Sequence, residues 1–129
     1  MIDRHFEECE RLLRGSALAA VVTSSRAHTS PETGYWRALV AFVDGSRLAV
    51  FEHVDVATGT PVVTKYRYHH MTAEDELVFR YDNAPHHPEI GTYPHHKHTG
   101  HGVAGTHQTT DAEVLREAEG LVLRQLLGP

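Results

Sequence analysis

Five stretches rich in β-branched and aromatic residues follow one another along the chain, and the connections between them are short. They are residues 17–23, 35–43, 47–55, 62–71 and 76–82. A parallel crossover needs about a dozen residues or more, so consecutive strands with such short links pair antiparallel. The dipeptide Asp44-Gly45 between two of these stretches is a strong hairpin signal. We therefore predict an antiparallel sheet of about five strands, with residues 24–34 as a loop.

Helical patterns stand at the two ends of the chain. Apolar residues recur at helical spacing over residues 3–14, and Cys9 follows this spacing as a small core residue. Near the other end, Thr110 and Glu113 have the spacing of a capping box, and an apolar stripe runs on to Gly128. These patterns predict a single α+β domain over residues 1–129, with an N-terminal and a C-terminal helix packed on the sheet.

Composition excludes several classes of protein. The 129 residues, 40% hydrophobic and 22% charged, suit one ordinary soluble core. No apolar run is long enough for a bilayer, the first residues are polar and acidic, and one cysteine allows no internal disulfide. We therefore expect a cytoplasmic protein without a membrane partner. The formal net charge of -5 gives no overall basic footprint of the kind that nucleic-acid binders carry.

Histidine is concentrated in one segment. Six of the twelve histidines lie within residues 86–101, among several prolines and glycines. Histidine changes charge near neutral pH and is a common metal ligand. Since the segment shows no sustained period, we predict a long His-rich loop over residues 83–107, before the last helix. Long loops of this kind in small domains are often functional.

Charged side chains next to this segment share faces of the predicted strands. Residues two apart in a strand point the same way, and the resulting set is Glu52, Lys65, Arg67, His69, Arg80 and Asp82. Glu52 lies among apolar neighbours and is a candidate buried acid. The set predicts a polar patch on adjacent strands, and the plainer alternative is a solvated face with cross-strand ion pairs.

Two kinds of chemistry suit these residues. In a metal-free reaction, histidines transfer protons during cleavage of an RNA phosphodiester while a cation stabilises the developing charge. The candidate catalytic residues are then Glu52, Arg80, Asp82, His86, His96 and His98, and the candidate substrate-binding residues are Lys65, Arg67, His69 and Lys97. In a metal site, His96, His98 and one of His86 or His87, with His87 as the named candidate, would bind zinc or another divalent ion together with Asp82 or Glu52. The plainest alternative is that these rings pack on prolines and tyrosines.

Two phrases in the second half of the chain resemble the TumE family. They are FRYDNAPHH at residues 79–87 and PHHKH at residues 94–98, with weaker support from FVDGS at 42–46, FEHVDV at 51–56 and KYRYH at 65–69. The family comprises toxins of type II toxin–antitoxin pairs. The resemblance implies a cytoplasmic toxin, a helix-turn-helix antitoxin as its partner, and endoribonuclease activity with RNA as the substrate.

Three functions therefore remain open at the level of sequence. The chain is a ribonuclease-like toxin, a non-catalytic interaction module that forms a homodimer or binds an antitoxin through exposed strand edges, or a metal-binding protein. The first reading requires Arg80, Asp82 and at least two imidazoles to meet in one cleft.

Overall fold

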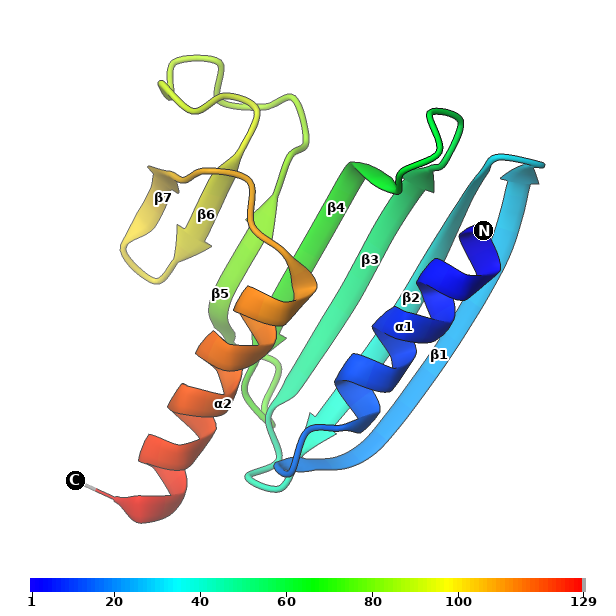
Figure 1. Cartoon of the computed structure of the whole chain (residues 1–129). Helices are drawn as coiled ribbons and strands as arrows, with labels where there is room; N and C mark the ends of the chain where they lie inside the picture. Colours follow the sequence, from blue (N-terminus) through cyan, green and yellow to red (C-terminus); the bar gives the residue numbers. More distant parts are fainter. Residues whose placement is uncertain (129) are drawn as a thin grey trace.

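One antiparallel sheet of seven strands forms the framework of the protein (Figure 1). The computed structural model describes residues 1–128, and Pro129, the last residue of the expected domain, lies outside the described residues. The elements in chain order are α1 (Ile2–Arg14), β1 (Ala19–Ser30), β2 (Thr33–Phe42), β3 (Arg47–Asp55), β4 (Val62–Met71), β5 (Leu77–Asp82), β6 (His96–Thr99), β7 (Gly102–Gly105) and α2 (Asp111–Leu127). Each strand pairs antiparallel with the next, so the order in the sheet follows the sequence.

The predicted α+β class and the antiparallel pairing are confirmed, but the number of strands is wrong. The prediction was about five strands, and the two additional ones, β6 and β7, come from the segment predicted as a loop. This hairpin extends the sheet beyond β5. Its signal was a short alternation in which His96 and His98 take one side and Lys97 the other, closed by a turn whose Gly102 has a φ of 116°.

A second correction concerns residues 24–34. They were predicted as a loop, yet β1 runs on to Ser30 and β2 begins at Thr33, so only a tight turn separates them. The Ser30 and Thr33 hydroxyls lie 2.6 Å apart across this turn. Most residues of β1 are exposed because it is an edge strand, so polar side chains are tolerated there as well as apolar ones. The hydrophobic pattern of the sequence therefore does not indicate the second half of this strand.

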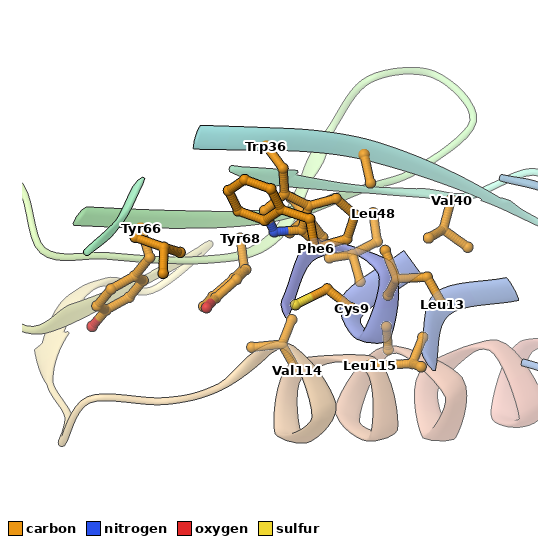
Figure 2. Packing of buried hydrophobic residues seen from close by; sticks show 14 of the residues in the cluster. Phe6, Cys9, Leu13, Trp36, Val40, Leu48, Tyr66, Tyr68, Val114 and Leu115 are labelled. Atoms are coloured by element: carbon orange, nitrogen blue, oxygen red, sulfur yellow. The ribbon is translucent and has the colours of Figure 1, made fainter. Parts of the chain in front are cut away.

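Both helices cover the same face of the sheet and enclose the core (Figure 1). Figure 2 shows side chains of the sheet meeting those of the helices, with Cys9 buried among them as expected. The buried residues of β2 and β3 alternate along each strand, as one-sided packing requires. Within residues 1–128 no helix covers the opposite face (Figure 1). One face of the sheet therefore packs against the helices to form the core, and the other face is open to polar side chains.

Helix α1 approaches the sheet most closely at Gly34. A methyl group added there would lie 2.8 Å from the backbone oxygen of Ala27 and 3.1 Å from the Cδ1 atom of Ile2. The first distance is shorter than any ordinary contact and involves backbone that cannot rotate away. The absence of a side chain at Gly34 thus allows the first turn of α1 to rest on β2.

We predict that Gly34→Ala lowers the free energy of unfolding by about 1–3 kcal/mol, because the methyl group forces the backbone of β1 or the first turn of α1 to move. Gly91→Ala is the matched control, since a methyl group there meets no atom within 4 Å. Urea denaturation of both variants measures the difference. Equal stabilities of the two variants would show that α1 is not seated on Gly34.

Candidate functional site

A cleft of about 430 Å³ opens on the uncovered face of the sheet, where β4, β5 and β6 lie side by side. Most of the candidate residues named from the sequence border it. They are Lys65, Arg67, Arg80, Asp82, His86, His87, His96 and His98. The His-rich segment therefore folds back over the charged side of the sheet.

Strand pairing explains why these side chains meet. In the antiparallel register, Asp82 lies opposite His96, and Arg80 lies opposite His98. On the other side of β5, Arg67 lies opposite Asp82. Since residues two apart share a face, three neighbouring strands present their charged side chains to the same space.

The Asp82 carboxylate is the centre of the cluster. It is only 5% exposed. One oxygen lies 2.9 Å from His96 Nε2 and accepts a hydrogen bond from the backbone N–H of Ala84 at 3.0 Å. The other oxygen accepts from Arg80 Nε at 3.1 Å and lies 3.6 Å from His98 Nε2. A buried carboxylate requires such charge partners, so Asp82 fixes the positions of the three side chains around it.

His96 is clamped between two acceptors. Its Nδ1 lies 2.8 Å from the Pro94 carbonyl oxygen, and its Nε2 faces Asp82. Both partners are acceptors when the carboxylate is ionised, so each ring nitrogen lies at hydrogen-bonding distance from an oxygen. The side chain is 2% exposed. His96 is therefore placed to hold Asp82 rather than to contact a substrate.

His98 and His87 present more accessible imidazoles beside this clamp. His98 is 18% exposed, and its Nε2 lies 3.3 Å from Arg80 Nη2. Burial, the Arg80 guanidinium and the neighbouring imidazoles lower the pKa of His98, while Asp82 opposes them, so the ring is neutral near pH 7. The His87 ring centroid lies 6.0 Å from that of His98, and its Nδ1 lies 3.3 Å from Glu89 Oε1.

The backbone of His87 adopts a φ of 60°, which is uncommon for a residue other than glycine. This conformation accompanies a ring that lies 5.4 Å from His96, centroid to centroid. His86, in contrast, borders the cleft with an exposed side chain. The geometry therefore favours His87 over His86 as the partner of His98.

One group of metal-ligand atoms lies inside the cleft. Asp82, His96 and His98 each offer an atom within 4.8 Å of the others, so the structure brings Asp82 rather than His87 together with the two histidines. However, the Arg80 guanidinium contacts both Asp82 and His98. Because a second cation would have to displace it, the arrangement suits proton transfer better than metal binding.

Glu52 and Lys97 do not join the patch predicted for them. Both lie on the face covered by the helices. Glu52 accepts hydrogen bonds from Trp36 Nε1 at 2.6 Å and from the Tyr68 hydroxyl at 2.5 Å. Lys97 donates to Glu117 of α2 at 2.8 Å. Strand alternation is the physical reason, because it places Glu52 with the apolar residues of β3 and turns Lys97 away from its two histidine neighbours.

His69 has an intermediate position. It lies opposite Arg80 in the register, and the Arg80 and Arg67 guanidinium groups contribute to its lowered pKa after burial. It stands on the cleft side of β4, yet it does not border the cleft.

Four residues that border the cleft were not among the candidate site residues: Arg37, Phe51, Tyr66 and Ala84. Arg37 and Phe51 lie opposite each other in β2 and β3, and Phe51 lies opposite Arg67. Residues 35–43 are nearly all apolar, so their pattern does not show that Arg37 faces outward. The pairing set by the Asp44-Gly45 hairpin was the signal that aligns Arg37 with Phe51, whereas Arg67 lies on β4, whose register this hairpin does not set.

Burial and the nearby Asp111 carboxylate raise the pKa of Glu52 to about 7, against the opposing effect of Trp36 and Tyr68. His5 and Cys9 of α1 lie close enough to form a second group of metal-ligand atoms with it. A raised pKa means that the folded protein holds the proton at a pH where the unfolded chain releases it. The associated stability is complete below pH 4.5 and is lost as the pH rises through about 7.

We predict that Glu52→Gln removes this loss of stability with rising pH. An amide cannot ionise, yet it still accepts a hydrogen bond from Trp36. Between pH 4.5 and about 7, the free energy of unfolding of the unmodified protein should fall by on the order of 2 kcal/mol more than that of the variant. Urea denaturation across this range measures both, and parallel pH dependences would contradict a buried, protonated Glu52.

A second prediction concerns His98. Arg80→Gln removes a neighbouring cation, so the pKa of His98 should rise toward its ordinary value of 6.5. Titration of the imidazole C–H signals by NMR measures the pKa in each protein. Lys65→Gln, which removes another cation from the same cleft, is the control and should leave the His98 pKa unchanged. A His98 pKa that does not respond to Arg80→Gln would refute the contact.

Neither helix of the described chain is long and apolar enough to cross a membrane.

Comparison with known proteins identifies the family of the chain. No curated protein and no solved structure gave a significant match to the chain. The model of a protein family described as Toxin TumE matches residues 9–125, which include all seven strands and every residue that borders the cleft. The resemblance seen in the sequence is thereby confirmed, and it implies the toxin component of a toxin–antitoxin system. The chain belongs to the TumE toxin family.

Proposed function

We propose that the chain is an endoribonuclease toxin that cleaves RNA in the cleft by metal-free acid–base catalysis. One observation carries the proposal: the Arg80 guanidinium, the Asp82 carboxylate and the imidazoles of His87, His96 and His98 meet in one accessible cleft. Cleavage of an RNA phosphodiester by its neighbouring 2′-hydroxyl requires one group that accepts a proton, one that donates a proton and a cation that stabilises the developing charge. Two imidazoles and a fixed guanidinium can fill these roles.

In the proposed reaction His98 is the general base. Its neutral ring takes the proton from the 2′-hydroxyl of the RNA, and the 2′-oxygen then forms a bond to the adjacent phosphorus. The bond from phosphorus to the 5′-oxygen of the next nucleotide breaks, and His87 gives that oxygen a proton. The products are a 2′,3′-cyclic phosphate and a 5′-hydroxyl. Arg80 stabilises the negative charge that develops on the phosphoryl oxygens.

The lowered pKa of His98 supports its role, because a general base must be unprotonated at the working pH. His87 borders the cleft and is 37% exposed, so it can reach a substrate. The Glu89 carboxylate beside its Nδ1 orients the ring, in the way that an acid orients the histidine of a catalytic triad. Asp82 and His96 act as positioning residues through Arg80 and His98.

The remaining candidates contribute to substrate binding. Lys65 and Arg67 border the cleft with exposed side chains and offer positive charge to phosphates on either side of the cleaved bond. His86, at the same border, is proposed as a further substrate contact. Glu52 and Lys97 have no part in this scheme, because both face the helices.

The partner implied by the family is an antitoxin. We propose a helix-turn-helix protein in this role and the cytoplasm as the site of action. A second candidate function is a non-catalytic module that acts by pairing with another protein or with a second copy of itself. The exposed edge strand β1 favours this alternative, because an open edge of this length can accept a further strand.

We predict that the purified protein cleaves RNA in the presence of a chelator. His98→Ala and His87→Ala should each reduce the cleavage rate by roughly 100-fold or more, since each removes a proton-transfer group. Mass spectrometry of the fragments should show cyclic phosphate ends. His101→Ala is the matched control, because His101 is exposed and lies outside the cleft.

Three results would contradict the scheme. Intact RNA under all conditions excludes the nuclease. Cleavage abolished by the chelator and restored by a divalent ion assigns the group of Asp82, His96 and His98 to a metal instead. A folded His98→Ala variant that still arrests growth favours the interaction module.

A further inference from the structure

The uncovered face of the sheet is hollowed beyond the cleft. A second depression of about 330 Å³ lies over β1 to β4, and it shares Arg37, Phe51 and Arg67 with the cleft. These three residues lie in line across β2, β3 and β4. The two depressions therefore adjoin at these residues, and together they form a track that crosses the strands and ends at the imidazoles.

Positive charge without a partner follows this track. Arg37, Lys65 and Arg67 are exposed, and none of them forms an ion pair with a carboxylate of the described residues. Arginines elsewhere, such as Arg14 and Arg26, do pair with acidic groups. In a chain of net charge -5, a row of unpaired cations on one face is a local feature that suits a polyanion.

Aromatic rings accompany the cations. Tyr35 and Phe51 lie on the same uncovered face with their ring centroids 6.3 Å apart, and both are only partly buried. The Arg37 guanidinium lies 4.7 Å from the Phe51 centroid and 5.6 Å from the Tyr35 centroid. Aromatic and guanidinium planes on an open sheet are surfaces on which unpaired bases stack.

We infer that this track binds single-stranded RNA, with a base on Phe51 and phosphates on Arg37, Lys65 and Arg67. Tyr35, whose ring neighbours Phe51 beside the track, offers a second stacking surface. A duplex fits poorly because its bases are already stacked and do not reach the rings. From β2 to β6 the track crosses four strand spacings, roughly 19 Å, which a strand of a few nucleotides spans. The inference rests on the proposed function only for the position of the cleaved phosphate.

Fluorescence anisotropy with a labelled 2′-O-methyl oligonucleotide tests the inference, since this probe has no 2′-hydroxyl and is not cleaved. Phe51→Ala and Arg37→Ala should each weaken its binding roughly tenfold. Arg37→Ala should also flatten the dependence of affinity on salt. Arg124→Ala, in α2 on the other side of the molecule, is the matched control and should bind as the unmodified protein does. A duplex of the same sequence should bind more weakly than the single strand.

Unchanged affinity in both track variants, or equal affinity for the duplex, would overturn the inference. Thermal unfolding of Phe51→Ala shows whether its fold is retained, and Arg37→Ala, at an exposed position, supplies the same test independently. Variants that no longer bind the antitoxin but still bind the oligonucleotide would assign this face to a protein partner. That result would also overturn the inference. Because the probe is not cleaved, failure of the nuclease reaction and failure of the track give different results.

Discussion

The contact between Asp82 and its partners across β5 and β6 is the interaction on which the site depends. A carboxylate that is 5% exposed is unfavourable unless it is hydrogen-bonded and balanced by charge. Arg80 balances the charge, and His96 and the Ala84 N–H lie at hydrogen-bonding distance from the carboxylate. Removing one of these partners would leave a buried group unsatisfied. The His-rich segment is therefore held against the sheet by the same contacts that orient His98.

The two faces of the sheet have different roles, and this difference explains most of the remaining structure. Residues that alternate along β2 and β3 pack on the helices, and their neighbours face the open side. The same alternation separates histidines that are adjacent in sequence: His96 faces the cleft, while His95 lies against Tyr66. A dense run of histidines is thus distributed between structure and site by the geometry of a strand.

The net charge of the chain does not describe the local charge of the uncovered face. The value of -5 reflects acidic residues on the helices and loops, such as Glu7, Glu8 and Glu119, whereas the uncovered face carries unpaired cations. Electrostatic attraction at short range depends on the local arrangement, because charges further away than about 8–10 Å are screened by salt. An acidic chain can therefore carry a local row of unpaired cations on one face.

The sequence by itself determined the class of fold, the antiparallel pairing, both helices and the family, because periodicity, short turns and the 79–98 motifs are local properties. It also determined that Arg80 and Asp82 share a face with each other and lead into the histidines. Tertiary structure alone decided which face the helices cover, and this buried Glu52 and turned Lys97 toward Glu117. It also decided that the His-rich segment forms β6 and β7, that Arg37 and Phe51 join the cleft, and that His87 lies nearer to His98 than sequence order suggests. The physical reason is that strand register and the side on which helices pack depend on contacts between residues far apart in the chain, which local patterns do not encode.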